Sequence, residues 1–304
     1  MPIPMIILEP IAHPTIWGGK NLCRYFDEPY EKIGHMYSLY DNDVSNKILN
    51  GEFMGKTIHD WFLRNKEKYS FQHFSAFPIV LAVVEATDSL SIQVHPDDTC
   101  AQKTENASWG KNESWYFLNA PESGWIYAGC KVTDKTEISN MIAKGLGSEI
   151  AGKLPIRAGD YVYVEAGTLH AMTKGSFVYE IEENSEYTYR LYDFNRIDAN
   201  GNKRELHLDK ALAALKPEKM PTVRHYEGKE ITERLYTTSL IENVNQYINQ
   251  SETLECITLL FDLDDTVEGV QLCYGMTIVL EPGDLLPVRC VRAMMARLKL
   301  EGIQ

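Results

Sequence analysis

Short stretches of β-branched and aromatic residues recur along most of the chain, and Gly, Pro, Asn or Asp residues separate them. Such stretches are typical of short β-strands, because these side chains pack well on a pleated surface and the intervening residues favour turns. The clearest examples are residues 91–95, 115–118, 161–164, 177–181 and 277–280. Many short strands of this kind predict a β-barrel or a β-sandwich.

Three helical segments are expected between the strands. The first covers about residues 57–69. The second follows Asp134, which has Glu137 three residues later at the spacing of a capping box. The third covers about residues 208–215 and ends before Pro217. We expect these helices to be packing elements.

The length of 304 residues allows two domains, each with its own core. Residues 216–221 contain two prolines and three charges, which interrupt both periodicities and indicate a linker. We therefore predict a domain over residues 1–216, with helical insertions, and a smaller C-terminal β domain over residues 222–304. The pair Gly283-Asp284 repeats the earlier Gly159-Asp160 turn signal, which suggests a related fold for the second domain.

The composition excludes several classes of protein. A formal net charge of −13 argues against a surface that binds nucleic acid or anionic membranes. No run approaches the roughly 18 to 20 apolar residues of a membrane span, and the apolar start of the chain ends at Glu9 without a preceding basic segment. The six cysteines include no C-x-x-C pair and are expected to be reduced. We expect a soluble, cytoplasmic protein whose partner is a small molecule.

Polar side chains fall on one face of several predicted strands. The period of two places Ser91, Gln93 and His95 together, although a solvent-facing strand would show the same alternation. Lys111 and Glu113 share a face of the next strand, and a later glycine turn is followed by His170. Together these residues offer a mixed set of nitrogen and oxygen donors, which suits Zn²⁺ or another divalent first-row metal.

The order and spacing of four motifs resemble those of the type I mannose-6-phosphate isomerases, in particular the short bacterial form. The resemblance runs from about residue 8 to about residue 208, and each motif taken alone is weak. The matching residues are Gln93, His95, Pro96 and Asp98; Gly110, Lys111 and Glu113; the segment from Gly159 to Ala171; and the segment from Tyr189 to Asp193.

This resemblance implies a mainly β protein with a cupin-type jelly-roll barrel as its catalytic domain, and a C-terminal cupin-like domain without a metal site. It implies that Gln93, His95, Glu113 and His170 bind zinc. It further implies catalytic roles for Lys111, Glu180 and Arg190, and substrate binding by Ser91 and Arg196. A solvated strand glutamate is the alternative for Glu180, and ordinary ion pairs or surface positions are the alternatives for the basic residues.

The chain departs from the family pattern at several positions. His35 and Tyr37 stand where the family usually has Glu and Trp, and Ala82 stands where it usually has Lys. Glu165 replaces a common Pro. These changes alter the charge near the predicted site and therefore bear on substrate preference.

The resulting hypothesis is a metal-dependent aldose–ketose isomerase that interconverts mannose 6-phosphate and fructose 6-phosphate through a cis-enediol. An isomerase for a different sugar or sugar phosphate is one alternative. A sugar-binding regulatory cupin that carries a metal but has no catalytic activity is another, and a cupin oxygenase is a more distant one.

Overall fold

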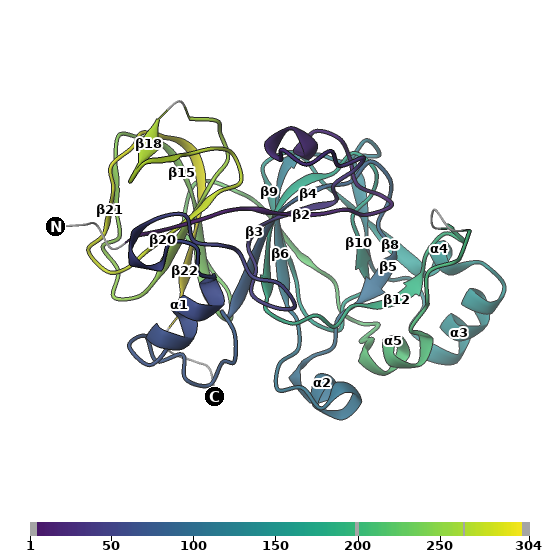
Figure 1. Cartoon of the computed structure of the whole chain (residues 1–304). Coiled ribbons are helices and arrows are strands. Elements are labelled where there is room, and N and C mark those ends of the chain that lie inside the picture. Colours follow the sequence, from purple (N-terminus) through teal and green to yellow (C-terminus); the bar gives the residue numbers. More distant parts are fainter. Residues whose placement is uncertain (1–4, 198–200, 264, 300–304) are drawn as a thin grey trace.

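The computed structural model describes residues 5–197, 201–263 and 265–299. Three large antiparallel β-sheets are stacked in it as layers, face to face (Figure 1). The central sheet has seven strands in the order β13-β9-β6-β11-β4-β3-β2. Its strands are β2 (Ile11–His13), β3 (His35–Leu39), β4 (Ile79–Glu85), β6 (Glu113–Asn119), β9 (Asp160–Val164), β11 (Phe177–Glu183) and β13 (Thr222–His225). The mainly β architecture that the sequence predicts is confirmed.

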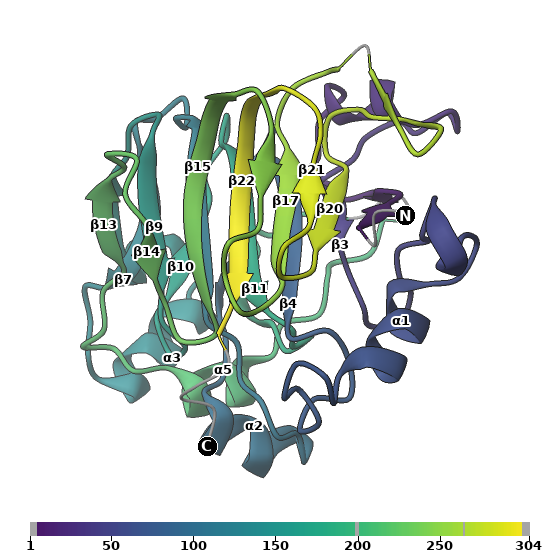
Figure 2. The same cartoon turned by 90° about the vertical axis from the view of Figure 1, so that its left-hand side faces the viewer.

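A five-stranded sheet covers one face of the central sheet, and a six-stranded sheet covers the other (Figure 1). The five-stranded sheet contains β12 (Tyr189–Tyr192), β5 (Ile92–Val94), β10 (His170–Ala171), β7 (Trp125–Cys130) and β8 (Ala151–Pro155). The six-stranded sheet contains β1 (Ile6–Leu8), β20 (Thr277–Leu280), β17 (Glu255–Leu259), β22 (Cys290–Leu298), β15 (Tyr236–Val244) and β14 (Ile231–Thr232). Figure 2 shows the strands of the six-stranded sheet in a row.

Alternation along the central strands divides the protein into two cores. In β11, Tyr179 and Ile181 pack in the core shared with the six-stranded sheet. Val178 packs in the core shared with the five-stranded sheet, and Glu180 lies on the same face because successive side chains point to opposite faces. A sheet buried on both faces explains why β4 reads as an uninterrupted apolar run from Ile79 to Val84.

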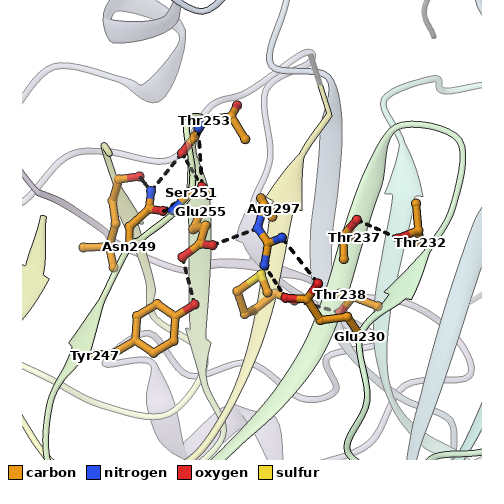
Figure 3. Close-up of polar contacts among 12 residues, drawn as sticks. Glu230, Thr232, Thr237, Thr238, Tyr247, Asn249, Ser251, Thr253, Glu255 and Arg297 are labelled. Atoms are coloured by element: carbon orange, nitrogen blue, oxygen red, sulfur yellow. Dashed lines mark hydrogen bonds and ion pairs between the residues drawn. The ribbon is translucent and has the colours of Figure 1, made fainter. Parts of the chain in front are cut away.

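Two small ribbons cover the outer face of the six-stranded sheet. They pair β16 (Tyr247–Ile248) with β21 (Leu285–Leu286), and β18 (Thr266–Val267) with β19 (Val270–Gln271). A polar network lies beside the first ribbon (Figure 3). The buried carboxylate of Glu255 accepts hydrogen bonds from Tyr247 Oη at 2.8 Å and from Arg297 Nε at 2.9 Å. Arg297 also pairs with Glu230, so the buried charge is compensated within this network.

The three predicted helices are present. They are α1 (Ile58–Asn65), α3 (Lys135–Ala143) and α5 (Leu208–Ala214). Thr57 and Asp60 form a reciprocal capping box at the start of α1, and Asp134 accepts a hydrogen bond from the Glu137 amide at the start of α3. Beyond these, the described residues form two more α-helices, α2 (Asp98–Glu105) and α4 (Gly147–Ile150), and two short 3₁₀ helices, η1 (Leu22–Tyr25) and η2 (Gly51–Phe53). Helix α2 buries only Ala101, so it carries no apolar periodicity from which it could be predicted.

The sheets interleave the two ends of the chain. Strand β1, from the start of the predicted first domain, pairs with β20 and so belongs to the six-stranded sheet. Strand β13 pairs with β9, so Thr222–His225 extends the central sheet although it follows the predicted linker. Each of the two predicted domains thus contributes one strand to a sheet formed mainly by the other. The predicted linker contacts the first domain, where the Lys216 amide donates to the Gly167 carbonyl.

The repeated Gly-Asp signal marks two turns of the same geometry. Gly159 and Gly283 have φ angles of 86° and 84°, which L side chains rarely adopt. In both turns the aspartate, Asp160 or Asp284, accepts a hydrogen bond of 2.8 Å from the amide three residues earlier. The two β units thus share a local construction as well as an antiparallel architecture.

All six cysteines are free. Within the described ranges, no helix combines the length and the apolar character needed to cross a membrane.

A buried hydrogen bond between Tyr236 Oη of β15 and Ser114 Oγ of β6, 2.6 Å long, joins the six-stranded sheet to the central sheet. Replacing Tyr236 by Phe leaves the serine hydroxyl without this partner, so we expect the free energy of unfolding to fall by about 1–2 kcal/mol. Urea denaturation measures the change. The Y30F variant is a control, because Tyr30 makes its hydrogen bond to Glu28 at the surface. Equal losses in the two variants would contradict the structural importance of the buried bond.

Candidate active site

A cavity of about 420 Å³ opens between the central and five-stranded sheets. Its walls come from strands of both sheets and from the loops that follow them. Most of the polar residues that the sequence singles out line it, namely Ser91, Gln93, Lys111, Glu113, His170, Glu180 and Arg190. Period-two alternation explains this convergence. On the central strands the polar side chains lie on the face that turns toward the five-stranded sheet, and on the strands of the five-stranded sheet they lie on the face that turns toward the central sheet.

His95, Glu113 and His170 meet at the closed end of the cavity. Glu113 is the first residue of β6 and His170 the first residue of β10, whereas His95 directly follows β5. The Nε2 atoms of His95 and His170 each lie 3.1 Å from an oxygen of the Glu113 carboxylate. All three side chains are buried. Their potential ligand atoms lie within 4.8 Å of one another, which is the arrangement of a metal-binding cluster.

Gln93 joins this cluster through strand register. It lies opposite His170 in the pairing of β5 with β10, so the two side chains share a face of the sheet. The Gln93 side-chain nitrogen is 3.4 Å from His170 Nε2. Since the two ends of a glutamine amide exchange by a simple flip, the oxygen can occupy this position. The four predicted ligands are therefore adjacent.

The donors at this centre fit a divalent metal ion. His95 Nδ1 lies 3.0 Å from the Tyr187 carbonyl and His170 Nδ1 lies 2.8 Å from the Thr168 carbonyl, so each ring donates from Nδ1 and directs the Nε2 lone pair inward. Burial lowers the pKa of His95 to about 4, which keeps this imidazole neutral. Among the described residues, His95 Nε2 and Glu113 Oε1 are buried without a hydrogen-bond partner. Ring lone pairs that point inward at a carboxylate repel it unless a cation lies among them, so this donor set fits a metal ion.

Lys111 and Glu180 lie beside this centre. The buried Lys111 ammonium contacts Glu182 Oε1 at 2.7 Å and Glu113 Oε2 at 3.8 Å. Although burial opposes the charge, Glu182 and Glu113 raise the pKa of Lys111, which stays cationic. Burial raises the pKa of Glu180, and the neighbouring Glu182 and Glu113 add to this shift. Glu180 Oε1 accepts a hydrogen bond of 2.8 Å from the Trp115 indole.

The second oxygen of Glu180 has no hydrogen-bond partner although it is buried. It lies 3.6 Å from His35 Nε2, too far for a hydrogen bond in this conformation. Burial lowers the pKa of His35 to about 3, with further lowering from His13 and Lys111. Glu180 thus presents one oxygen to a cavity in which the nearest imidazole is neutral.

Two arginines, Arg190 and Arg204, line the cavity. Arg190 pairs with Gln93 across β12 and β5, which places its side chain beside the metal-binding cluster. Its Nε donates to the Glu205 carbonyl at 3.0 Å, and its two Nη groups make no hydrogen bond to any residue in the described ranges. Arg190 therefore offers free donors to a ligand.

Arg196 is not among the residues that line the cavity, and its substrate-binding role stays a prediction. Its Nη1 donates to the Ser89 carbonyl and contacts Asp88, and its Nη2 pairs with Asp193. These contacts hold the guanidinium among protein acceptors. Ser91 does line the cavity, and its Oγ lies 3.5 Å from Gln93 Oε1.

The first part of the chain, residues 5–118, matches the model of the catalytic domain of type I phosphomannose isomerase. The chain is 33% identical over 239 residues to the mannose-6-phosphate isomerase ManA of Bacillus subtilis, covering 78% of this chain and 76% of that protein. It is 36% identical over 214 residues to the mannose-6-phosphate isomerase of Streptococcus mutans, covering 69% and 67%. The chain belongs to the type I phosphomannose isomerase family.

A solved structure extends this similarity to the whole fold. The mannose 6-phosphate isomerase structure from Bacillus subtilis superimposes with a TM-score of 0.81 at 27% identity, covering 96% of this chain and 99% of that one. The predicted cupin fold and the predicted membership of the phosphomannose isomerase family are therefore confirmed. The type I phosphomannose isomerases are metal-dependent, and His95, Glu113 and His170 form a cluster that could hold the metal.

Three of the departures from the phosphomannose isomerase pattern, His35, Tyr37 and Ala82, lie close together beside the cavity, whereas Glu165 is exposed and pairs with Lys219. Ala82 is directly opposite Tyr37 on one side and Glu180 on the other, in the order β3-β4-β11. His35 stacks on Tyr37 at 5.3 Å between ring centroids and contacts Trp17 edge-on at 5.1 Å. Two rings and the small side chain of Ala82 therefore stand where the family usually has Glu, Trp and Lys. Of the cavity residues that sequence reasoning missed, Glu182 could have been found from its position two residues after Glu180 on the same face.

Metal content tests the cluster directly. We expect protein loaded with zinc and then desalted to retain about one metal ion per chain, and the E113A variant to lose most of it, because the carboxylate supplies the negative charge of the site. Elemental analysis measures this, with circular dichroism to establish folding. The E186A variant is the matched control, because Glu186 lines the cavity outside the cluster. Equal metal retention in E113A and wild type would rule out the proposed ligands.

Proposed function

We propose that this protein interconverts mannose 6-phosphate and fructose 6-phosphate through a cis-enediol, and that the metal bound by Gln93, His95, Glu113 and His170 is zinc. The observation that carries this proposal is the arrangement within one cavity. A buried donor cluster for a metal lies beside a carboxyl group of raised pKa and a buried ammonium group, and arginine donors face the same space.

The donor set supports zinc. Two imidazole nitrogens and a carboxylate oxygen are typical of catalytic zinc sites, which keep a position open for water or substrate. The amide oxygen of Gln93 adds a weaker ligand. When bound, the ion would polarise the oxygens at C1 and C2 of the sugar.

The protein groups supply the remaining requirements of aldose–ketose isomerisation. In the open-chain aldose the proton leaves C2, its electron pair forms the C1–C2 double bond, and the carbonyl oxygen at C1 gains a proton. Return of a proton to C1 and loss of the hydroxyl proton at C2 complete the ketose. Glu180 is suited to exchange a proton with the substrate because its Oε2 accepts no hydrogen bond from any described residue. Lys111 remains cationic and stabilises negative charge on the enediolate oxygens.

The substrate assignment is supported by the relatives, which are named for mannose 6-phosphate, and by the free donors of Arg190. Guanidinium groups bind phosphate through paired hydrogen bonds. The wall formed by His35, Tyr37 and Ala82 favours a second candidate, an isomerase for a different sugar or sugar phosphate, because it lies against Glu180.

A coupled assay with chelator-treated and metal-replete protein tests the proposed function. We expect turnover of mannose 6-phosphate that is lost on chelation and restored by Zn²⁺, with much weaker turnover of unphosphorylated mannose. Preferred turnover of another sugar in the same assay would favour the second candidate. Tight sugar binding in calorimetry without turnover of any sugar would indicate a regulatory binding protein instead.

The E180Q variant tests the proton-transfer role. Glutamine retains the size and can still accept the Trp115 hydrogen bond, but it cannot release or take up a proton. We expect kcat to fall by about 10²–10⁴-fold and KM to change little. Incorporation of deuterium from D₂O into the sugar phosphate, followed by NMR, should fall in parallel. The E186Q variant serves as the control, since Glu186 lies at the exposed rim. Retention of wild-type kcat in E180Q would exclude Glu180 as the proton-transfer group.

A further inference from the structure

Arg204 is the second guanidinium of the cavity, and neither its sequence context nor the family motifs draw attention to it. It lies in the segment after β12, beyond the residues that carry the motif. The structure nevertheless brings its side chain to the same cavity as Arg190, Ser91 and Gln93.

A fork of hydrogen bonds holds Arg204 in place. Its Nε donates to Asp193 Oδ2 at 2.8 Å and its Nη2 donates to Asp193 Oδ1 at 2.5 Å. Asp193 is only 5% exposed, so a buried carboxylate holds the Arg204 guanidinium in place. The remaining terminal group, Nη1, makes no hydrogen bond to a residue of the described ranges. Arg204 is thus oriented by the protein and keeps one donor for a ligand.

Arg190 and Arg204 place two like charges near each other. Burial lowers the pKa of Arg190, and the charge of Arg204 lowers it further. Asp193 is already shared by Arg204 and Arg196 and cannot neutralise both cavity arginines. A dianionic group between Arg190 and Arg204 would relieve this repulsion and take up the free donors of both, as expected for a phosphate.

Arg196 has the opposite environment although it binds the same carboxylate. Its contacts with Asp88, Ser89 and Asp193 use both of its Nη groups. Its Nε is buried and has no hydrogen-bond partner in the part of the chain that the structure describes. The difference between the two arginines lies in direction: Arg204 faces the cavity, and Arg196 faces the loop that contains Asp88.

We propose that Arg204 is a substrate-binding residue which, together with Arg190, holds the phosphate group of the sugar phosphate, and that Arg196 instead supports Asp193. This inference rests on the proposed function for the identity of the substrate. It assigns to Arg204 a role in selecting phosphorylated over unphosphorylated sugars.

The R204A variant tests the proposal in two independent measurements. Loss of a charge-assisted hydrogen bond to phosphate should raise KM for mannose 6-phosphate by about 10- to 100-fold, with kcat changed by less than about threefold. Inorganic phosphate should stabilise the metal-loaded wild type against thermal unfolding, and R204A should lose most of this shift. The second measurement needs no turnover, so it remains informative even if the protein acts on a different phosphorylated sugar.

Two further variants make the result specific. K203A removes the adjacent exposed cation, whose contact is with Asn195, and should retain the wild-type KM and the phosphate-induced shift. R196A removes the other ion pair of Asp193. It tests the competing assignment, in which Arg196 binds the phosphate. A rise in KM and a lost phosphate shift in R196A, with both quantities unchanged in R204A, would overturn the proposal. Equal losses of stability in R196A and R204A, with only R204A impaired toward phosphate, would support it.

The R204K variant distinguishes the charge that would bind phosphate from the forked contact that holds the side chain on Asp193. Lysine keeps the charge but cannot make the forked contact with Asp193, so we expect an intermediate KM and a partial phosphate shift. A wild-type phosphate shift in R204A would show that Arg204 makes no contact with the phosphate, whatever the activity of the protein proves to be.

Discussion

The meeting of two imidazole lone pairs with one buried carboxylate is the interaction on which the arrangement of the cavity depends. His95 and His170 are both turned inward by hydrogen bonds from Nδ1 to backbone carbonyls, and Glu113 faces them from the opposite sheet. Without a cation this arrangement places repelling groups in a buried part of the molecule at a cost. The orientation of the two rings therefore suits a centre that could hold a metal, and the register of β5 with β10 brings Gln93 to the same point.

The remaining charges of the cavity are arranged around this centre. Lys111 separates Glu113 from Glu182 and so lets two acids lie close together in a buried space. Burial raises the pKa of Glu180, and the neighbouring Glu182 and Glu113 raise it further. Arg204 is held by Asp193, and Arg190 lies in β12 opposite Gln93 of β5. The same small cavity therefore has a cluster that could hold a metal and two arginines in its wall, in a protein whose formal net charge is −13.

Much of this arrangement could be predicted from the sequence because it depends on strand alternation. A period of two is sufficient to place Gln93 beside His95 and to separate Glu180 from Tyr179, and the structure follows it. The arginines could not be assigned in this way. Arg196 and Arg204 lie in a loop segment, where no periodicity defines direction, and their orientations depend on contacts with Asp193 and Ser89 that only the folded chain provides. The exchange of β1 and β13 between the sheets was unpredictable for a related reason, because pairing over such distances leaves no local signal.

His35 and Ala82, two departures from the family pattern, both lie next to Glu180. A lysine at position 82 would lie directly between Tyr37 and Glu180 in the register, where its charge would favour the ionised carboxylate. Alanine removes that charge, and His35 replaces a neighbouring acid with a ring that burial keeps neutral. Loss of a cation and an anion together leaves the local charge balanced. The change that remains is in the proton affinity of Glu180, because its free oxygen now faces a neutral imidazole and a methyl group where the family pattern would supply an ammonium. His35 and Ala82 both adjoin Glu180 and thus change its surroundings, and neither belongs to the cluster that could hold a metal.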